Sequence, residues 1–175
     1  MGLVRSFQIS AVFPNLTVLE NVRIALQRQG GHSFDFWRAD ATLSELHERA
    51  LALIEAVGLT EFAGTHAVLL PYGRKRALEI ATTLALDPEL MLLDVPTQGM
   101  GHEDVGRVVE LIRKVAAGRT IMMVEHNLHV VADLSHTITV LARGAILAEG
   151  PYAEVSKNPK VLEAYVGTTD PAAHG

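Results

Sequence analysis

The sequence predicts an α/β fold with a parallel β-sheet, chiefly because two short apolar runs are separated by a helix-length gap. Leu90–Leu93 ends at Asp94, and Ile121–Val124 ends at Glu125-His126. A continuous apolar run of this length is typical of a strand buried on both faces of a parallel sheet. Between the runs, apolar residues recur at helical spacing: Val105, Val108, Val109, Leu111, Ile112 and Val115. The pattern predicts a strand–helix–strand unit with a carboxylate and an imidazole at neighbouring strand ends, where open parallel sheets bind ligands.

The composition indicates a globular protein. The chain has 175 residues, of which 49% are hydrophobic and 20% charged, enough for a domain with a sizeable core. The formal net charge of −5 gives no reason to expect a nucleic-acid partner. The absence of cysteine excludes disulfides and suits a reducing cytosol. No apolar run is long enough for a membrane helix, and no secretory signal opens the chain.

The elements before the central unit begin with a strand. Leu3–Phe7 alternates in polarity and leads to Gln8. Thr17–Glu20 has the pattern of a capping box, so a helix is expected to start there and to run through Leu26. Residues 30–41 read as a surface insertion, since glycines break the helical pattern before them.

Two more helices are expected before the first apolar run. A second capping box, Thr42–Glu45, predicts a helix that ends at Gly58. Gly73 precedes a helical pattern with an apolar face, which ends at Asp87-Pro88. The charged run Arg74–Arg76 in this helix is expected to be a solvated face.

The remainder of the chain is predicted to contain two helices and a hairpin. A short helix follows His126 and ends at Leu134. Residues 138–141 and 145–148 flank Arg143-Gly144, which is typical of a β-hairpin. A last helix is expected from about Lys160 to Val166.

Four elements, taken in order, carry a family resemblance: Phe7-Gln8, Leu70–Gly73, Leu90–Pro96 and Val124–His126. This succession resembles the ATP-binding subunit of ABC transporters. The Leu-x-Tyr-Gly form, Gly99-Met100 and the ending Val161–Gly167 are similar to the subgroup that serves branched-chain amino acid importers. The resemblance extends from about Gly2 to Gly167.

The resemblance implies a P-loop NTPase-like parallel sheet core with a helical subdomain, lacking the N-terminal Walker A strand and helix. Residues 1–16 would then be the Q-loop strand and loop, and residues 17–86 the helical subdomain with the signature segment. Residues 87–150 would form the Walker B and H-loop core, and residues 151–175 a C-terminal helix and tail.

The resemblance also assigns roles to five residues. Asp94 matches the Walker B aspartate, which holds Mg²⁺ because a hard cation prefers carboxylate oxygen. Gln8 matches the Q-loop glutamine, and His126 matches the switch histidine that donates to the γ-phosphate or to the attacking water. Tyr72 and Gly73 match the signature segment, whose backbone N–H groups bind a phosphate presented by the facing subunit. The alternatives are a helix-capping aspartate, a solvated glutamine and structural residues at the other positions.

Several departures from the family pattern bear on activity. The sequence contains no Gly-x-x-x-x-Gly-Lys-[Ser/Thr] loop, which supplies the amide cradle and the lysine for phosphates. Val95 stands where the family has its catalytic glutamate, and Pro71 replaces the signature serine. We therefore expect a subunit truncated at its N-terminus, with the strand beside that of Asp94 missing. An apolar sheet flank would be exposed, so the isolated chain is expected to be poorly soluble or to need a partner.

The resemblance implies an ATP-binding subunit of a branched-chain amino acid ABC importer, which couples ATP binding and hydrolysis to transport, with a degenerate and incomplete site in this chain. The implied cofactors are ATP and Mg²⁺, and this chain is expected to bind them weakly. Permease subunits and a second ATP-binding subunit would be its partners, on the cytoplasmic side of the membrane. The family is a transport ATPase, but little or no ATP hydrolysis is expected of this chain alone, because it has no Walker A loop and has Val95 at the position of the catalytic glutamate. A non-catalytic interaction module is the alternative, and a metal hydrolase using His126 and His129 is a third reading. The transported substrate is not specified by this chain.

Overall fold

The computed structural model describes residues 3–5, 12–29 and 40–166. The chain divides into two compact units, residues 1–125 and residues 126–175, and each is described by itself. Gln8 and most of the insertion predicted at residues 30–41 lie outside the described residues.

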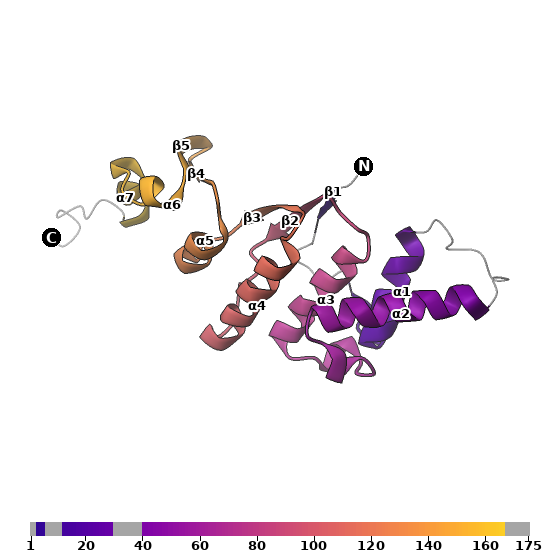
Figure 1. Ribbon diagram of the computed structural model, residues 1–175. Coiled ribbons are helices and arrows are strands. Elements are labelled where there is room, and N and C mark those ends of the chain that lie inside the picture. The colour runs from indigo at the N-terminus through magenta and orange to yellow at the C-terminus, as the bar shows by residue number, and fades with distance from the viewer. Residues whose placement is uncertain (1–2, 6–11, 30–39, 167–175) are drawn as a thin grey trace. The chain divides into compact units, whose positions relative to one another are not determined.

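The first unit contains a three-stranded parallel sheet in the order β1-β2-β3 (Figure 1). The strands are β1 (Leu3–Arg5), β2 (Leu90–Asp94) and β3 (Thr120–Val124). The helix α4 (His102–Val115) connects β2 to β3. The predicted strand–helix–strand unit is therefore confirmed, and with it the α/β class with a parallel sheet.

The two outer strands pair with both edges of β2, so the prediction that the strand beside that of Asp94 is missing is wrong. The physical reason is that β1 and β3 are both supplied by this chain. The uncovered part of the described sheet lies on β3 instead, where Met122 is 63% and Val124 is 59% exposed. The prediction that this run is buried on both faces is wrong for β3. In β2 the prediction holds for one face only: Met91 and Leu93 are buried, whereas Leu90 and Leu92 on the opposite face are half-buried.

Helices pack together beside the sheet to form the rest of the first unit. They are α1 (Val18–Gln29), α2 (Asp40–Ala56) and α3 (Tyr72–Leu84), and α4 packs on α3 (Figure 1). Short 3-10 turns at Thr60–Phe62 and Ala67–Leu69 lead into α3. The largest completely buried side chains come from several of these elements: Val18, Val22, Ile54, Leu59, Leu78, Ile80 and Met91. Burial of these apolar side chains is the main contribution to the stability of this unit.

The first predicted capping box is confirmed, and the second is wrong. Thr17 donates its backbone N–H (2.7 Å) and its hydroxyl (2.8 Å) to Glu20 Oε2, and the N–H of Glu20 donates to Thr17 Oγ1 (3.2 Å). By contrast, α2 begins at Asp40, so Thr42 lies within its first turn and is not the N-cap. The predicted end of this helix is close, since Gly58 has a φ of +69° just beyond Ala56.

The capping box should make stability depend on pH. The backbone N–H of Thr17, and then its hydroxyl, lower the pKa of Glu20 below the usual 4.5. A carboxylate with a lowered pKa in the folded state stabilises the fold above its unfolded pKa, and the contribution is lost as the pH falls through the lowered value. Relative to the wild type, Glu20→Gln should lower the melting temperature above pH 4.5, and the difference should shrink in more acidic solution. Thermal melts from acidic to neutral pH would show this, and a difference that stays constant would contradict it.

The second unit contains the hairpin and helices that follow His126. Its elements are α5 (Leu128–Leu134), β4 (Ile138–Ala142), β5 (Ala145–Gly150), α6 (Tyr152–Val155) and α7 (Pro159–Val166). The two strands are antiparallel, and the connecting Arg143 and Gly144 have φ values of +49° and +78°. Positive φ at both residues is the property of the favoured hairpin turn, so the predicted hairpin is confirmed. The sequence patterns did not predict α6.

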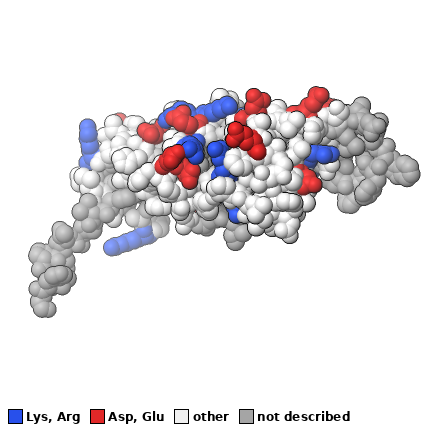
Figure 2. Space-filling model, turned by 90° about the horizontal axis from the view of Figure 1, so that it is seen from below, with Lys and Arg blue, Asp and Glu red and all other residues white. Residues whose placement is uncertain are grey.

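Charges of both signs lie close together on the surface. Figure 2 shows acidic and basic side chains interleaved over one face of the molecule. On α4, Arg107 pairs with Glu103 and Arg113 pairs with Glu110, and all four side chains are about half exposed or more. Pairs this exposed contribute little to stability. None of the helices in the described ranges has the length and apolar character needed to cross a membrane.

Candidate functional site

The turn after β2 carries the first candidate site residue and has an unusual backbone. Asp94 ends the strand, and Val95 follows it with a φ of +40°. A β-branched residue is rarely found at positive φ, and such conformations cluster at functional sites. The N–H of Val95 donates to the carbonyl of Val124 at the end of β3 (2.9 Å), which continues the sheet pairing past Asp94. The turn is therefore anchored to the sheet at the strand end that carries the carboxylate.

A buried arginine of α3 holds the same turn from the helical side. The guanidinium of Arg76 donates through Nη2 to the carbonyls of Asp94 (2.8 Å) and Val95 (3.0 Å). Its Nε donates to the carbonyl of Pro96 (3.2 Å), and its Nη1 lies 2.5 Å from Glu79 Oε2. Arg76 and Glu79 are each 7% exposed, so the prediction that Arg74–Arg76 is a solvated face is wrong for Arg76. The physical reason is that three carbonyl oxygens and a carboxylate replace the water around the charge.

A second side chain holds the turn from the end of β3. Glu125 Oε1 accepts the backbone N–H of Thr97 (2.9 Å) and also the hydroxyl of Thr97. Thr97 is only 5% exposed, so these hydrogen bonds are largely shielded from solvent. Hydrogen bonds to a carboxylate are stronger than those between neutral groups, and they are stronger still in a less polar environment. The turn from Asp94 to Thr97 is thus held by charged side chains from α3 and from the end of β3.

The predicted signature segment lies at the start of α3. The helix begins at Tyr72, two residues earlier than the sequence pattern indicated, and Gly73 is in its first turn. The first intrahelical bond runs from the N–H of Lys75 to the carbonyl of Pro71 (3.0 Å). The N–H groups of residues 72–74 therefore have no intrahelical acceptor, and no side chain caps this helix end. Amides at a helix N-terminus favour an anion, and Tyr72 beside them is 54% exposed.

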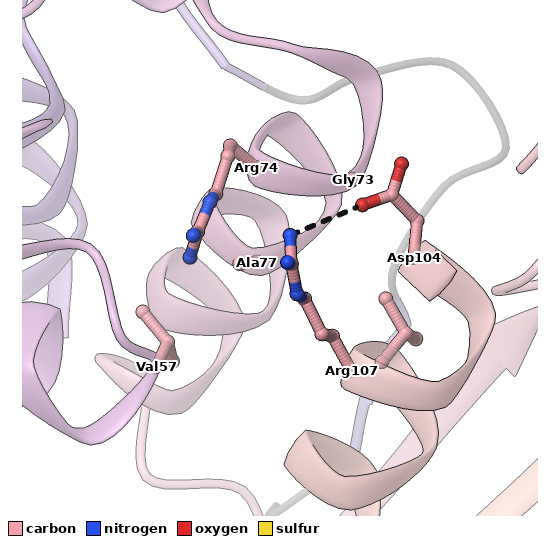
Figure 3. A pocket seen from close by; sticks show the side chains of 7 residues that line it. Val57, Gly73, Arg74, Ala77, Asp104 and Arg107 are labelled. Carbon is pink, nitrogen blue, oxygen red and sulfur yellow. Dashed lines mark ion pairs between the residues drawn. The ribbon is translucent and has the colours of Figure 1, made fainter. Parts of the chain in front are cut away.

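Gly73 also has a packing role against α4. A Cβ atom at this position would lie 3.0 Å from Asp104 Cγ, so a larger side chain would force Asp104 to move. Figure 3 shows Gly73 beside Asp104, which is paired with Arg107 (3.7 Å). The residues around this point line a small pocket between α3 and α4: Val57, Gly73, Arg74, Ala77, Asp104, Arg107 and Val108. Its volume of about 40 Å³ is enough for a water molecule or two and far too small for a nucleotide.

Of the remaining candidates, Gln8 lies outside the described residues and His126 belongs to the second unit. His126 is the first residue of the second unit, whereas Asp94 belongs to the first. Asn127 caps α5 by accepting the N–H groups of His129 (3.1 Å) and Val130 (3.4 Å). His126 thus precedes the helix that contains His129, so the two histidines do not lie on one helix. The described ranges contain no group of three His, Cys, Asp or Glu residues able to hold a metal ion. The roles that the resemblance assigns to Asp94, Gln8 and His126 stay predictions.

The comparisons with known proteins place the chain in a family. The ABC transporter profile matches residues 2–98, and the profile described as branched-chain amino acid ATP-binding cassette transporter matches residues 145–171. The high-affinity branched-chain amino acid transport ATP-binding protein LivG of Salmonella typhimurium is 35% identical over 174 residues, covering 95% of this chain and 68% of LivG. BraF of Pseudomonas aeruginosa, with the same description, is 34% identical over 176 residues and covers 95% of this chain and 68% of BraF.

Solved structures agree with the fold. A nucleotide-free ATP-binding cassette from an ABC transporter is 27% identical, with a TM-score of 0.74 over 95% of this chain and 69% of that one. The ADP conformation of MJ1267, also an ATP-binding cassette of an ABC transporter, has a TM-score of 0.77 over 95% of this chain and 68% of that one. The identity of 24% in that case supports the fold alone. The fold is therefore that of an ATP-binding cassette, which confirms the predicted P-loop NTPase-like class.

The matched family profile and the relatives LivG and BraF indicate the same family for this chain. This chain belongs to the ABC transporter ATP-binding family.

Proposed function

We propose that this chain serves as the ATP-binding subunit of a branched-chain amino acid importer. The observation that carries the proposal is 35% identity to LivG over 95% of the chain, with the branched-chain profile matching residues 145–171. In this role the chain would couple the binding of ATP to transmembrane transport. Its partners would be permease subunits and a second ATP-binding subunit, at the cytoplasmic face of the membrane.

The described residues offer suitable donors for Mg²⁺ and phosphate. Asp94 supplies a carboxylate at the carboxyl end of β2, the donor type that Mg²⁺ prefers. Tyr72 and Gly73 supply N–H groups at the start of α3, which favour a phosphate presented by the facing subunit. Gln8 and His126 would orient the attacking water and contact the γ-phosphate. Bound Mg²⁺ would neutralise the charge that develops on the transferring phosphoryl group.

Two substitutions support a degenerate site with little hydrolysis. A general base at position 95 would orient and polarise the attacking water, and Val95 has no acceptor for that purpose. Pro71 has neither the hydroxyl nor the N–H of serine, so the N-terminus of α3 offers two fewer donors. The sequence also contains no Gly-x-x-x-x-Gly-Lys-[Ser/Thr] loop.

We also propose that residues 17–86 form the helical subdomain and that residues 87–150 form the Walker B and H-loop core.

Weak binding of ATP by the chain alone is the expected result. The two phosphate-binding features that the described residues offer are a single carboxylate for the metal and the open amides of α3. Titration calorimetry of the 175-residue chain with Mg-ATP should therefore give a dissociation constant in the millimolar range or weaker, about −4 kcal/mol. Asp94→Asn serves as the matched control, because it removes the charge and keeps the size. Micromolar binding that Asp94→Asn abolishes would contradict a degenerate site.

A non-catalytic interaction module is the second candidate, and the same two substitutions favour it. Such a module would pair with a complete ATP-binding subunit or with the membrane subunits and would adjust transport without hydrolysis of its own. The two candidates differ in the assembled complex. Asp94→Asn should lower ATP hydrolysis by the complex if this chain contributes a working metal site, and should leave hydrolysis unchanged if the chain is a module.

A further inference from the structure

The guanidinium of Arg76 binds three consecutive backbone carbonyls that begin at Asp94. These carbonyls belong to Asp94, Val95 and Pro96, at donor–acceptor distances between 2.8 and 3.2 Å. Three successive carbonyls directed at one group require an unusual backbone path, and Val95 supplies it with its φ of +40°. A strained conformation persists only where its surroundings hold it. Arg76 is therefore a main contact that keeps the backbone after Asp94 on this path.

The arrangement around Arg76 is buried and electrically balanced. Its side chain is 8% exposed and that of Glu79 is 9% exposed, and the two form an ion pair on the same helix. Glu79 takes one end of the guanidinium, which leaves Nη2 and Nε for the three carbonyls. A planar guanidinium with five fixed donors suits several acceptors at once, whereas the ammonium of lysine is a compact point charge. Arginine at this position thus does more than neutralise Glu79.

We propose that Arg76 is a positioning residue for Asp94: it fixes the backbone that directs the Asp94 carboxylate toward the metal. This inference rests on the proposed function, in which Asp94 holds Mg²⁺. The same helix begins with Tyr72 and Gly73, so one rigid element carries both the signature segment and the support of the metal-binding turn. A competing explanation is that Arg76 serves only to neutralise Glu79 within α3. The two explanations differ in what happens to the turn when the guanidinium is replaced and a positive charge is kept.

Hydrogen exchange of the whole chain, followed by mass spectrometry of peptides, tests the support of the turn. Arg76→Lys keeps the charge near Glu79 but loses the fork that reaches the carbonyls. Exchange in a peptide covering residues 93–100 should become about tenfold faster or more, while exchange in residues 102–115 stays unchanged. Thr82→Val is the matched control, since Thr82 lies on the same helix and its hydroxyl donates to the carbonyl of Glu79 (2.9 Å). Unchanged exchange in residues 93–100 of Arg76→Lys would overturn the proposal.

A second variant keeps the proposal testable if Arg76→Lys fails to fold. Arg76→Met combined with Glu79→Met removes both buried charges together, and replacing a buried ion pair by apolar side chains often leaves a fold stable. The double variant should also lose protection in residues 93–100. Retained protection there would show that the carbonyl contacts do not hold the turn, and would overturn the proposal as well.

The metal readout separates positioning from a merely structural role. Mn²⁺, added in small amounts to the isotope-labelled chain, should broaden the amide resonances of Val95 and Glu125 by paramagnetic relaxation, and Asp94→Asn should abolish the broadening. In Arg76→Lys the broadening of Val95 should fall relative to that of the wild type, although Asp94 is intact. Loss of exchange protection with unchanged broadening would mean that Arg76 is structural, and would overturn the positioning role. Broadening that survives Asp94→Asn would instead refute the metal role of Asp94, and the exchange experiment would still decide whether Arg76 holds the turn.

Discussion

Replacing Pro71 with serine is expected to strengthen ATP binding by an assembled complex about ten- to hundredfold. Pro71 is the N-cap of α3, with φ −56° and ψ 154°, an extended conformation that serine adopts readily. Serine would add one N–H and one hydroxyl beside the open amides of residues 72–74. A hydrogen bond to a charged group contributes about 1.5–3 kcal/mol, which is the basis of the expected factor. The measurement is ATP affinity of the complex between this chain, the permease subunits and a complete ATP-binding subunit.

Pro71→Ala is the control for this substitution. Alanine restores the backbone N–H without the hydroxyl, so its effect should be smaller than that of serine. If both variants bind ATP as the wild type does, the start of α3 does not face a phosphate, and Gly73 would be explained by its packing against Asp104 alone.

Replacing Leu78 with alanine is expected to lower the free energy of unfolding by about 3 kcal/mol. Leu78 lies in the middle of α3 and is completely buried. Truncation to alanine removes favourable burial and leaves a cavity, for which measured costs are about 2–5 kcal/mol. Because α3 carries Arg76, the same change should loosen the support of the turn after Asp94. Unfolding in urea, followed by circular dichroism, gives the free energy.

Leu69→Ala is the matched control, since Leu69 is 71% exposed and precedes the same helix. Its effect should stay within about 0.5 kcal/mol, as is usual for surface substitutions. Equal losses for the two leucines would contradict the placement of α3 in the core.

The sequence predicted the central strands and their order along the chain because their signal is local. The run before Asp94 and the run before Glu125 are short, apolar and bounded by polar residues, and the spacing between them fits one helix. The solvent exposure of Met122 could not be predicted from this local pattern. An apolar residue gives the same signal whether or not another layer covers it, so periodicity predicts a strand and not the occupancy of its two faces.

The capping boxes show how local patterns succeed and fail. Thr17–Glu20 forms the expected reciprocal bonds, whereas Thr42–Glu45 lies inside a helix that begins at Asp40. Thr-x-x-Glu is compatible with a helix interior as well as with its start, because the helix can begin a turn earlier when the preceding residues permit it. The pattern alone does not choose between the two positions.

The residues that hold the turn after Asp94 could not be predicted from the sequence. Arg76 lies in a charged run that is typical of a solvated helix face, yet it is buried. Its acceptors are carbonyls 18–20 residues further along the chain, and they face it because Val95 adopts a positive φ. Glu125 and Thr97 are likewise 28 residues apart. Such contacts depend on tertiary packing, and no spacing rule reports them.

Co-purification tests the assignment of this chain to a transport complex. The tagged chain would be produced together with permease subunits and a complete second ATP-binding subunit of the branched-chain type, and the membranes would be solubilised in detergent. We expect the chain to be recovered in a stoichiometric complex with both kinds of subunit. Recovery of the chain without the permease subunits, under conditions in which LivG co-purifies with its own permease subunits, would contradict a role in transport.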